Sequence, residues 1–554
     1  MTRRSARTLR RVDNPRMSSR DPGAASGAIG GGLTRRSLLQ CAGVVLAPVP
    51  AAVAASASRW FGDDGRPGAL AQQAVALLAD APSHGLVADD YAAAALQAAL
   101  QRRAWTPEAA ARLDQSLDSA MQRFLTDLHQ GRVDPATLQL RYAPARAAPF
   151  DPAAALQSAR AGGNLAEAVS AAAPALPQYQ ALRDALATYR RLADHPAWQQ
   201  TLPPLPADAA SPRRSAKLSP GQDYAGAGLL AWRLAVLGDL RTPALPRGDT
   251  VRYDGVLVPA ARAFQQRHGL AADGVVGSAT LAALQVPPAA RARQIELALE
   301  RLRWTPLLQA PRMIVINIPE FVLRAYEVVD GRIELREQMK VIVGKALDTR
   351  TPLFDEDLRF IEFSPYWNVP PSIARGETVP KLRRDPGYFD REGFEFVAPD
   401  GSVLTGLSAA RLDAVLAGRL RIRQRPGPRN ALGDIKFVFP NRENIYLHHT
   451  PSTALFERQR RDFSHGCIRV ERPVALASFV LQGQPGWTEQ RIREAMAQGR
   501  STTLRVDQPL PVLIAYGTTL VQQGRILFLD DVYGQDRLLD AALRQPRPAL
   551  PTFD

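Results

Sequence analysis

The sequence predicts an α+β protein of several domains, with helices in its first half and a β-rich domain in its second half. Its 554 residues, 46% of them hydrophobic, are enough for two to four domains with separate cores. Between residues 65 and 200 the apolar residues recur at the 3.6-residue period of amphipathic helices. From about residue 310 the period changes to two, the alternation of half-buried strands. We therefore expect a helical scaffold, a small three-helix module and a β-rich domain, in that order.

The first 57 residues have the layout of an export signal. Two adjacent arginines, Arg35 and Arg36, precede a modest apolar run at 41–53. Small-residue triplets of the kind that precede a cleavage site follow at 52–57. We expect residues 1–57 to be a disordered leader with a twin-arginine-type signal peptide, and we expect the processed protein to be periplasmic.

The net charge of the chain limits its partners. A formal charge of +15 is compatible with nucleic acid, an anionic membrane or an anionic polymer. The sequence contains no zinc-knuckle spacing, no RNP-type aromatic strand and no basic recognition helix, so we expect no nucleic-acid partner. Past the leader there is no run of 18 apolar residues, so we expect no stable membrane span after processing.

The helical region at 65–200 is predicted to be a scaffold domain. Its Ala-rich amphipathic runs are interrupted by Gly131–Pro135, and no acid/base pair or metal cluster stands out among its residues. The stretch 201–222, which is rich in Pro and Ser, has the composition of a linker.

A more specific signal lies at 223–286. Glycines there mark turns between short helices, which we expect at about 228–237, 260–268 and 278–284. The sequence FQQRHGLAADGVVGSATLAAL, which begins at Phe264, resembles the peptidoglycan-binding type 1 domain, a three-helix module. The resemblance implies that this module binds the bacterial cell wall, without naming the residues that contact it.

The β-rich domain is expected at 310–540. Period-two segments and turn signals such as Asp330-Gly331 mark its strands. The predicted strands are 313–318, 321–326, 334–343, 359–363, 435–439, 444–447 and 512–516. A long insertion rich in Pro, Gly and Arg, at about 368–430, separates two groups of these strands. Long loops in compact domains are usually lids or binding loops, so we expect this insertion to be a substrate lid.

The candidate chemistry lies at 445–450 and 464–470. Of the two cysteines, Cys41 belongs to the leader, so the processed chain has one thiol, Cys467, and no internal disulfide. A cysteine nucleophile needs a base, because a free thiol is only a few per cent ionised at neutral pH. His448, on a neighbouring strand, can supply that base. Gly466 lets backbone amides converge on a substrate oxygen. A His/His/Cys metal site would need a fourth ligand, and none is nearby, so we expect no metal.

At these residues the chain resembles the YkuD-type L,D-transpeptidases, whose pattern is read here as His448, fifteen residues, and then Ser-His-Gly-Cys-Ile-Arg. The resemblance implies that Cys467 is the acyl-enzyme nucleophile and that His448 is the general base, with its ring oriented by the carbonyl of His449. It further implies that His465 and Gly466 line the oxyanion site with the Cys467 amide. The expected substrate-binding residues are Arg469, Ser464, Tyr446, Trp367 and Asn368.

Further sequence segments are similar to those of the large, YcbB-like members of that family, including Tyr366-Trp367-Asn368-Val369-Pro370-Pro371 and Pro426-Gly427-Pro428-Arg429-Asn430. The resemblance implies a two-step reaction without a cofactor. The thiol attacks the bond between diaminopimelate and D-Ala of a peptidoglycan tetrapeptide stem, and an amine of another stem then resolves the thioester as a 3→3 cross-link. It also implies acylation by carbapenems. Other wall-synthesis enzymes are candidate partners.

The sequence leaves three alternatives open. The same acyl-enzyme could pass its acyl group to a lipoprotein lysine, a free D-amino acid or water, because the motif fixes the nucleophile and not the acceptor. The chain could instead be a wall-binding protein without catalytic activity. A histidine, His449, follows His448 where relatives often have Gly, Ser or Asp, and this leaves open which imidazole takes the proton.

Overall fold

The computed structural model describes residues 60–62, 64–144, 149–207, 216–241, 251–307 and 310–551. The chain divides into two units, residues 1–56 and 57–554, and the description below concerns the second unit. The predicted leader and its twin-arginine signal lie outside the described residues. In the ranges given above, no helix is long and apolar enough to cross a membrane.

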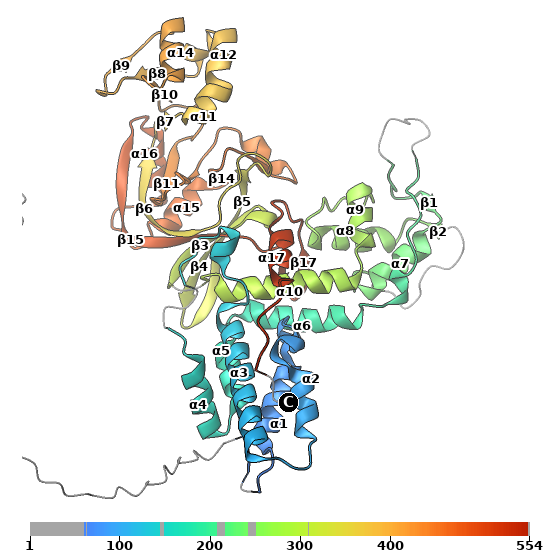
Figure 1. Cartoon of the computed structure of the whole chain (residues 1–554). Coiled ribbons are helices and arrows are strands. Elements are labelled where there is room, and N and C mark those ends of the chain that lie inside the picture. The colour runs from blue at the N-terminus through green and yellow to red at the C-terminus, as the bar shows by residue number, and fades with distance from the viewer. Residues whose placement is uncertain are drawn as a thin grey trace, which may run out of the picture. The chain divides into compact units, whose positions relative to one another are not determined.

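The first domain is helical, as predicted, and has its own core. Its long helix α3 begins after Thr106, whose side chain caps the helix by accepting a hydrogen bond from the Ala109 amide at 3.2 Å. One face of α3 is buried at helical spacing, for example at Leu113, Leu117 and Phe124. The helices of this domain are α1 (Ala69–Ala79), α2 (Ala93–Leu100), α3 (Pro107–Gln130), α4 (Pro152–Gly162) and α5 (Leu165–Ala172), and they are labelled in Figure 1.

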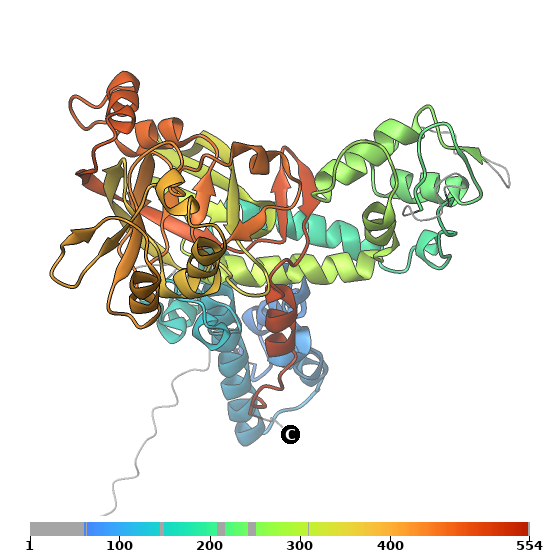
Figure 2. The same ribbon diagram turned by 90° about the horizontal axis from the view of Figure 1, so that it is seen from above.

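Two helices far apart in sequence, α6 (Pro177–Arg191) and α10 (Pro288–Trp304), pack side by side (Figure 2). The three-helix module lies between them in sequence, so it is inserted within the helical part of the chain. Its elements are β1 (Asp223–Tyr224), α7 (Ala227–Val236), β2 (Val251–Arg252), α8 (Leu257–Arg267) and α9 (Ser278–Gln285). Leu202 and Leu218, from the stretch predicted as a linker, are buried in the core of this module. The described residues at the two ends of this stretch therefore contribute to the module, in addition to connecting two domains.

The β-rich domain is built on a nine-stranded sheet with the order β13-β5-β14-β12-β11-β6-β15-β3-β4. The long strand β5 pairs with both β4 and β14, so eight of these strands close on themselves in the manner of a barrel. The strands are β3 (Arg312–Asn317), β4 (Val322–Val329), β5 (Arg332–Gly344), β6 (Asp355–Phe363), β11 (Ile435–Val438), β12 (Leu447–His448), β13 (Asp462–Ser464), β14 (Ile468–Val470) and β15 (Thr502–Ala515). Two helices follow β14, α15 (Pro473–Val480) and α16 (Glu489–Ala497).

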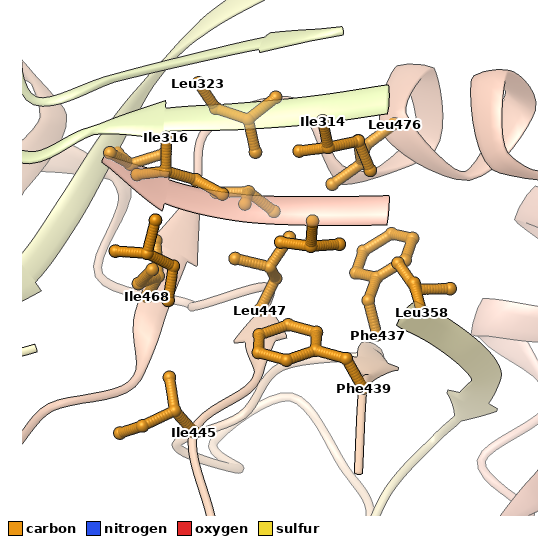
Figure 3. Close-up of a cluster of buried hydrophobic side chains, with 14 of the residues drawn as sticks. Ile314, Ile316, Leu323, Leu358, Phe437, Phe439, Ile445, Leu447, Ile468 and Leu476 are labelled. Carbon is orange, nitrogen blue, oxygen red and sulfur yellow. The ribbon is translucent and has the colours of Figure 1, made fainter. Parts of the chain in front are cut away.

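The core of this domain is filled by side chains from alternate positions of the strands. Ile314 and Ile316 of β3 point into it together with Leu358 of β6 and Phe437 of β11 (Figure 3). Leu447 of β12 and Ile468 of β14 join the same cluster and are fully buried. Because strand side chains alternate between the two faces, the neighbours of these core residues must lie on the opposite face of the sheet.

The insertion predicted as a long loop is a folded subdomain. Its elements are β7 (Trp367–Asn368), α11 (Pro371–Ile373), a π-helical turn (Ala374–Thr378), α12 (Val379–Arg384), α13 (Tyr388–Arg391), β8 (Phe394–Val397), β9 (Val403–Leu404), α14 (Ala409–Leu416) and β10 (Arg421–Gln424). Its four strands form a sheet in the order β7-β10-β8-β9, over a core that includes Leu382, Phe389 and Phe396. Its strands have only two to four residues, too short for a clear period in the sequence.

The end of the chain returns to the helical part. A hairpin of β16 (Thr519–Gln522) and β17 (Arg525–Phe528) contacts α6, α8 and α10, and α17 (Gln535–Leu543) contacts α10. Beyond α17, the guanidinium of Arg547 pairs with the carboxylate of Asp127 on α3, and Leu550 packs against the core of the first domain. The C-terminal segment thus joins the β-rich domain to the scaffold.

Candidate functional site

The candidate site lies on the polar face of two parallel neighbouring strands. Leu447 of β12 is opposite Ile468 of β14, and His448 is opposite Arg469. Opposite residues of paired strands point to the same side, and Leu447 and Ile468 point into the core. His448 and Arg469 therefore share the other face. The same register places Tyr446 beside Cys467, and the Ile468 amide donates to the Tyr446 carbonyl at 3.0 Å.

The first of these strands is shorter and later than the sequence predicted. We expected a strand at 444–447, but β12 covers only Leu447–His448. The Asn441 side chain holds a turn before it, since its amide donates to the Phe439 and Ile445 carbonyls at 2.6 and 2.7 Å. Asn444 adopts a φ of 54°, in the left-handed region that asparagine tolerates. Ile445, which follows this turn, is buried in the core, and the strand begins only at Leu447.

The loop that carries the thiol is braced from within. Ser464 is 2% exposed, and its hydroxyl donates to the Cys467 carbonyl at 2.5 Å and accepts from the Gly466 amide at 3.2 Å. The Thr351 hydroxyl donates to the Gly466 carbonyl at 2.7 Å. Gly466 has a φ of 118°, which favours glycine, and a Cβ there would approach Ile445. This geometry favours a bracing part for Ser464 over the substrate contact predicted from the sequence.

The thiol of Cys467 is half-buried and faces several polar groups. Burial raises its pKa, while hydrogen bonds from the Tyr446 backbone and hydroxyl, and the positive charges of Lys436 and Arg469, act in the opposite direction. Its sulfur also lies 3.7 Å from the Asn444 carbonyl. In the described part of the chain, no hydrogen bond joins this sulfur to His448.

His448 is 4% exposed, and its Nδ1 lies 2.5 Å from the His449 carbonyl oxygen. A carbonyl can only accept, so Nδ1 carries the proton and Nε2 keeps its lone pair. Burial, followed by the charge of Arg469, lowers the pKa of His448 to about 3. The ring is therefore neutral at physiological pH and has the tautomer that a base requires.

His449 is directed elsewhere. Its Nδ1 accepts from the Asp434 amide at 3.4 Å, and its ring packs so closely on Gly433 that a Cβ there would lie 2.5 Å from Nδ1. Of the two adjacent imidazoles, only that of His448 lies on the face shared with Cys467. This arrangement favours His448 as the base.

The remaining predicted residues are placed differently. The Nε2 of His465 lies 2.6 Å from the Glu377 carboxylate, so the loop before Cys467 contacts the inserted subdomain. Trp367 and Asn368 pair with β10 inside that subdomain, opposite Gln424 and Arg423. Among the described residues, no hydrogen bond or ion pair joins Trp367 or Asn368 to the Cys467 loop.

Three family models match this chain. Residues 311–488 match the model described as "L,D-transpeptidase catalytic domain" (YkuD), residues 55–186 match a scaffold domain, and residues 229–284 match a "Putative peptidoglycan binding domain". The β-rich domain belongs to the YkuD family of L,D-transpeptidase catalytic domains. The inferred family and the predicted domain types, a helical scaffold, a helical wall-binding module and a β-rich catalytic domain, are confirmed.

Sequence and structure relatives agree with this to different degrees. A protein of Haemophilus influenzae named "Putative L,D-transpeptidase" is 34% identical over 229 residues, which are 41% of this chain and 45% of the relative. The match thus spans less than half of that relative. A Clostridium acetobutylicum protein titled as a fused Zn-dependent amidase/peptidase with a peptidoglycan-binding domain is 13% identical and covers 55% of this chain and 100% of its own, with a TM-score of 0.17. Bdellovibrio bacteriovorus Bd1075 is 14% identical over 42% of this chain and 56% of its own, also with a TM-score of 0.17. These last two scores are too low to carry an argument.

Sequence reasoning missed two charged residues of the L,D-transpeptidase domain, Glu362 and Lys436. They are opposite each other on β6 and β11, and Lys436 is also opposite His448. Lys436 stands between the buried residues Ile435 and Phe437, so the alternation of its strand could have placed it on the face of the histidine. The described residues include no cluster of three or more His, Cys, Asp or Glu that could hold a metal ion.

The neutral buried histidines predict loss of stability in acid. Burial lowers the pKa of His84 and His448 to about 3, and that of His268 well below its ordinary range. Unfolding would expose these rings, which then bind protons below pH 6.5. Because the folded state does not bind these protons, the free energy of unfolding decreases as the pH falls below 6.5. We expect the melting temperature to be highest above pH 6.5 and to fall continuously toward pH 4 in a thermal scan. A melting temperature unchanged between pH 7 and pH 4 would contradict this.

Proposed function

We propose that this protein is a cysteine L,D-transpeptidase that forms 3→3 cross-links in peptidoglycan. The observation that carries the proposal is the shared polar face on which the strand register sets Tyr446, His448, Cys467 and Arg469. This face combines a thiol, a neutral imidazole, a hydroxyl donor and a cation. An acyl transfer through a thioester needs a nucleophile, a base and hydrogen-bond donors for the developing oxyanion. The cation can in addition bind an anionic group of the substrate.

In the first step, His448 takes the thiol proton and Cys467 attacks the carbonyl that links diaminopimelate to the terminal D-Ala. The carbon–nitrogen bond then breaks, the proton passes to the leaving amine, and D-Ala departs. In the second step, the side-chain amine of a diaminopimelate on another stem attacks the thioester. The new amide forms, the carbon–sulfur bond breaks, and the thiol regains its proton.

Arg469 is proposed to bind a substrate carboxylate. Its guanidinium is half-buried, and its buried Nε has no hydrogen-bond partner among the described residues. Burial lowers its pKa, and the nearby thiol acts in the opposite direction. A buried cation without a partner is costly, and an anionic ligand would remove that cost. Peptidoglycan stems carry such carboxylates.

The inserted subdomain is proposed to cover the acceptor side of the site. Its Glu377 contacts His465, two residues before the thiol. The neighbouring wall-binding module would hold the enzyme on its polymeric substrate. We also propose that the protein works in the periplasm after twin-arginine export, and that its net positive charge favours binding to the anionic polymer of the wall.

The test is intact-mass spectrometry of the protein after mixing with a carbapenem and, separately, with a disaccharide-tetrapeptide. The wild type is expected to form a carbapenem adduct and a cross-linked dimer of the tetrapeptide, and Cys467→Ala to form neither. A carbapenem adduct together with hydrolysed tripeptide, but no cross-linked dimer, would mean that water is the acceptor and that the protein is a carboxypeptidase. A folded wild type that gives no adduct and no product, yet binds purified sacculi, would leave a wall-binding protein without catalytic activity.

A further inference from the structure

Lys436 lies at the centre of the reactive face. Its strand β11 stands between β6 and β12, so Lys436 is opposite Glu362 on one side and His448 on the other. Directly opposite residues share a face of the sheet. The lysine therefore points to the same side as the histidine, while the adjacent Phe437 points into the core.

Two contacts fix the lysine side chain. Its Nζ lies 3.2 Å from the Glu362 carboxylate and 4.4 Å from the centroid of the Tyr446 ring. The lysine side chain is 17% exposed. A cation above an aromatic face is attracted by the electron density of the ring, and the attraction grows when water is excluded. Glu362 thus holds a partly desolvated ammonium on the face of Tyr446.

Tyr446 connects this ammonium to the thiol. The strand register sets Tyr446 beside Cys467. Burial, followed by the charge of Cys467 and a hydrogen bond to it, raises the pKa of Tyr446 well above its ordinary value. The phenol therefore keeps its proton and can donate a hydrogen bond to the sulfur. A cation on the ring face withdraws electron density from the phenol, which makes its hydroxyl a stronger donor. A stronger donor stabilises a thiolate more than a neutral thiol.

We propose that Lys436 is a positioning residue for the nucleophile: Glu362 holds its ammonium on the Tyr446 ring, and Tyr446 transmits the effect to the sulfur of Cys467 through its hydroxyl. The inference rests on the proposed role of Cys467 as nucleophile, but its effect on the thiol is measurable without transpeptidation. The charged and titratable groups nearest the thiol on this face of the strands are Glu362, Lys436, Tyr446, His448, Cys467 and Arg469. The same alternation puts Arg505 of β15, and Lys340 and Glu471 beyond Arg469, on this face.

The experiment measures the alkylation rate of Cys467 by iodoacetamide in the full chain as a function of pH. Peptide mass mapping separates this thiol from Cys41. We expect Lys436→Met to raise the midpoint of the profile by about one pH unit, which is about a tenfold slower alkylation below the midpoint. Lys436→Arg, which keeps the charge, should stay close to the wild type. A purely structural part for the lysine would lower the stability of the protein without moving this midpoint.

A double-mutant cycle tests the path through the ring. Tyr446→Phe removes the hydroxyl and should raise the midpoint by itself. In that background, Lys436→Met is expected to cause a clearly smaller shift than in the wild type, because only the direct effect of the lysine charge on the thiol remains. Equal shifts in both backgrounds would overturn the part assigned to Tyr446.

The matched control is Lys381→Met, because Lys381 lies 3.6 Å from the centroid of the Tyr388 ring inside the inserted subdomain. It should leave the midpoint unchanged. If Lys436→Met also leaves it unchanged, the inference is wrong. If Lys436→Met loses the circular dichroism spectrum of the wild type, Lys436→Gln makes the same comparison. If Lys436→Met shifts the midpoint but the wild type forms no cross-links, the proposed function is wrong and this inference stands. If the wild type forms cross-links but Lys436→Met leaves the midpoint unchanged, the proposed function stands and this inference is wrong.

Discussion

Replacing His448 with alanine is expected to slow acylation of Cys467 by a carbapenem by about 10²- to 10⁴-fold, the usual range for the loss of a positioned general base. The hydrogen bond from Nδ1 to the His449 carbonyl at 2.5 Å leaves Nε2 free to take a proton. Burial keeps the ring neutral, with a pKa of about 3. The measurement is the second-order rate of adduct formation, followed by intact mass.

The comparison variant is His449→Ala. The imidazole of His449 accepts from the Asp434 amide, and its backbone carbonyl, which orients His448, survives the substitution. We expect a loss of less than about tenfold, since acid–base chemistry is retained. A larger loss for His449→Ala than for His448→Ala would make His449 the base.

The pH profile of the wild type gives a second check on the same pair. Burial raises the pKa of Cys467, so the thiol is mostly protonated at pH 7. His448 is already neutral there and does not titrate between pH 5 and pH 9. With His448 as general base, the reactive state is the neutral thiol beside the neutral imidazole, so the acylation rate should be nearly independent of pH between pH 5 and pH 7. A rate that rises about tenfold per pH unit through this range would mean that the thiol must first ionise to solvent, without His448 as its base.

The strands of the catalytic domain could be predicted because their core residues alternate. Predicted strands at 313–318 and 435–439 correspond to β3 and β11 with shifts of about one residue, and the alternation at Ile435 and Phe437 is the one seen in the core. The inserted subdomain gave no such signal. Its strands are two to four residues long, and prolines and glycines surround them.

The candidate site was predictable where a local motif encodes it. The spacing between His448 and Cys467 is visible in the sequence, but the partners of the site come from distant segments. Glu377 reaches the loop from the insertion, and Glu362 reaches Lys436 from another strand. Such pairings depend on which strands become neighbours, and a single sequence does not state that order.

Helix α10 likewise has neighbours that a single sequence does not state. It contributes Ile295 and Leu299 to one core and Leu297 and Trp304 to another, so it is apolar on more than one side. Charged residues are buried along it as well, among them Glu300 and Arg303. A helix with this pattern has no single apolar stripe, and the sequence did not mark it as the element that unites the domains.

Glu300 is expected to be among the most sensitive positions for stability. Its side chain is 2% exposed, and one oxygen accepts from Arg303 Nη1 at 2.6 Å. The other oxygen accepts from the amides of Arg132 and Val133 at 2.5 and 2.9 Å, just after α3 ends. The carboxylate thus compensates a fully buried guanidinium and satisfies two backbone donors of the scaffold.

Glu300→Ala should therefore destabilise the packing of the scaffold on α10 by about 3–5 kcal/mol, because it leaves a buried cation without its partner and two amides without an acceptor. Denaturant unfolding, followed by tryptophan fluorescence, measures this through Trp304, whose indole lies close to Gly131 beside the same carboxylate. Glu494→Ala, which removes the exposed pair with Arg491 at 3.6 Å, is the matched control and should change stability by less than about 1 kcal/mol. Equal effects of the two substitutions would mean that water compensates Arg303 in place of Glu300, and that the junction between scaffold and catalytic domain does not depend on this ion pair.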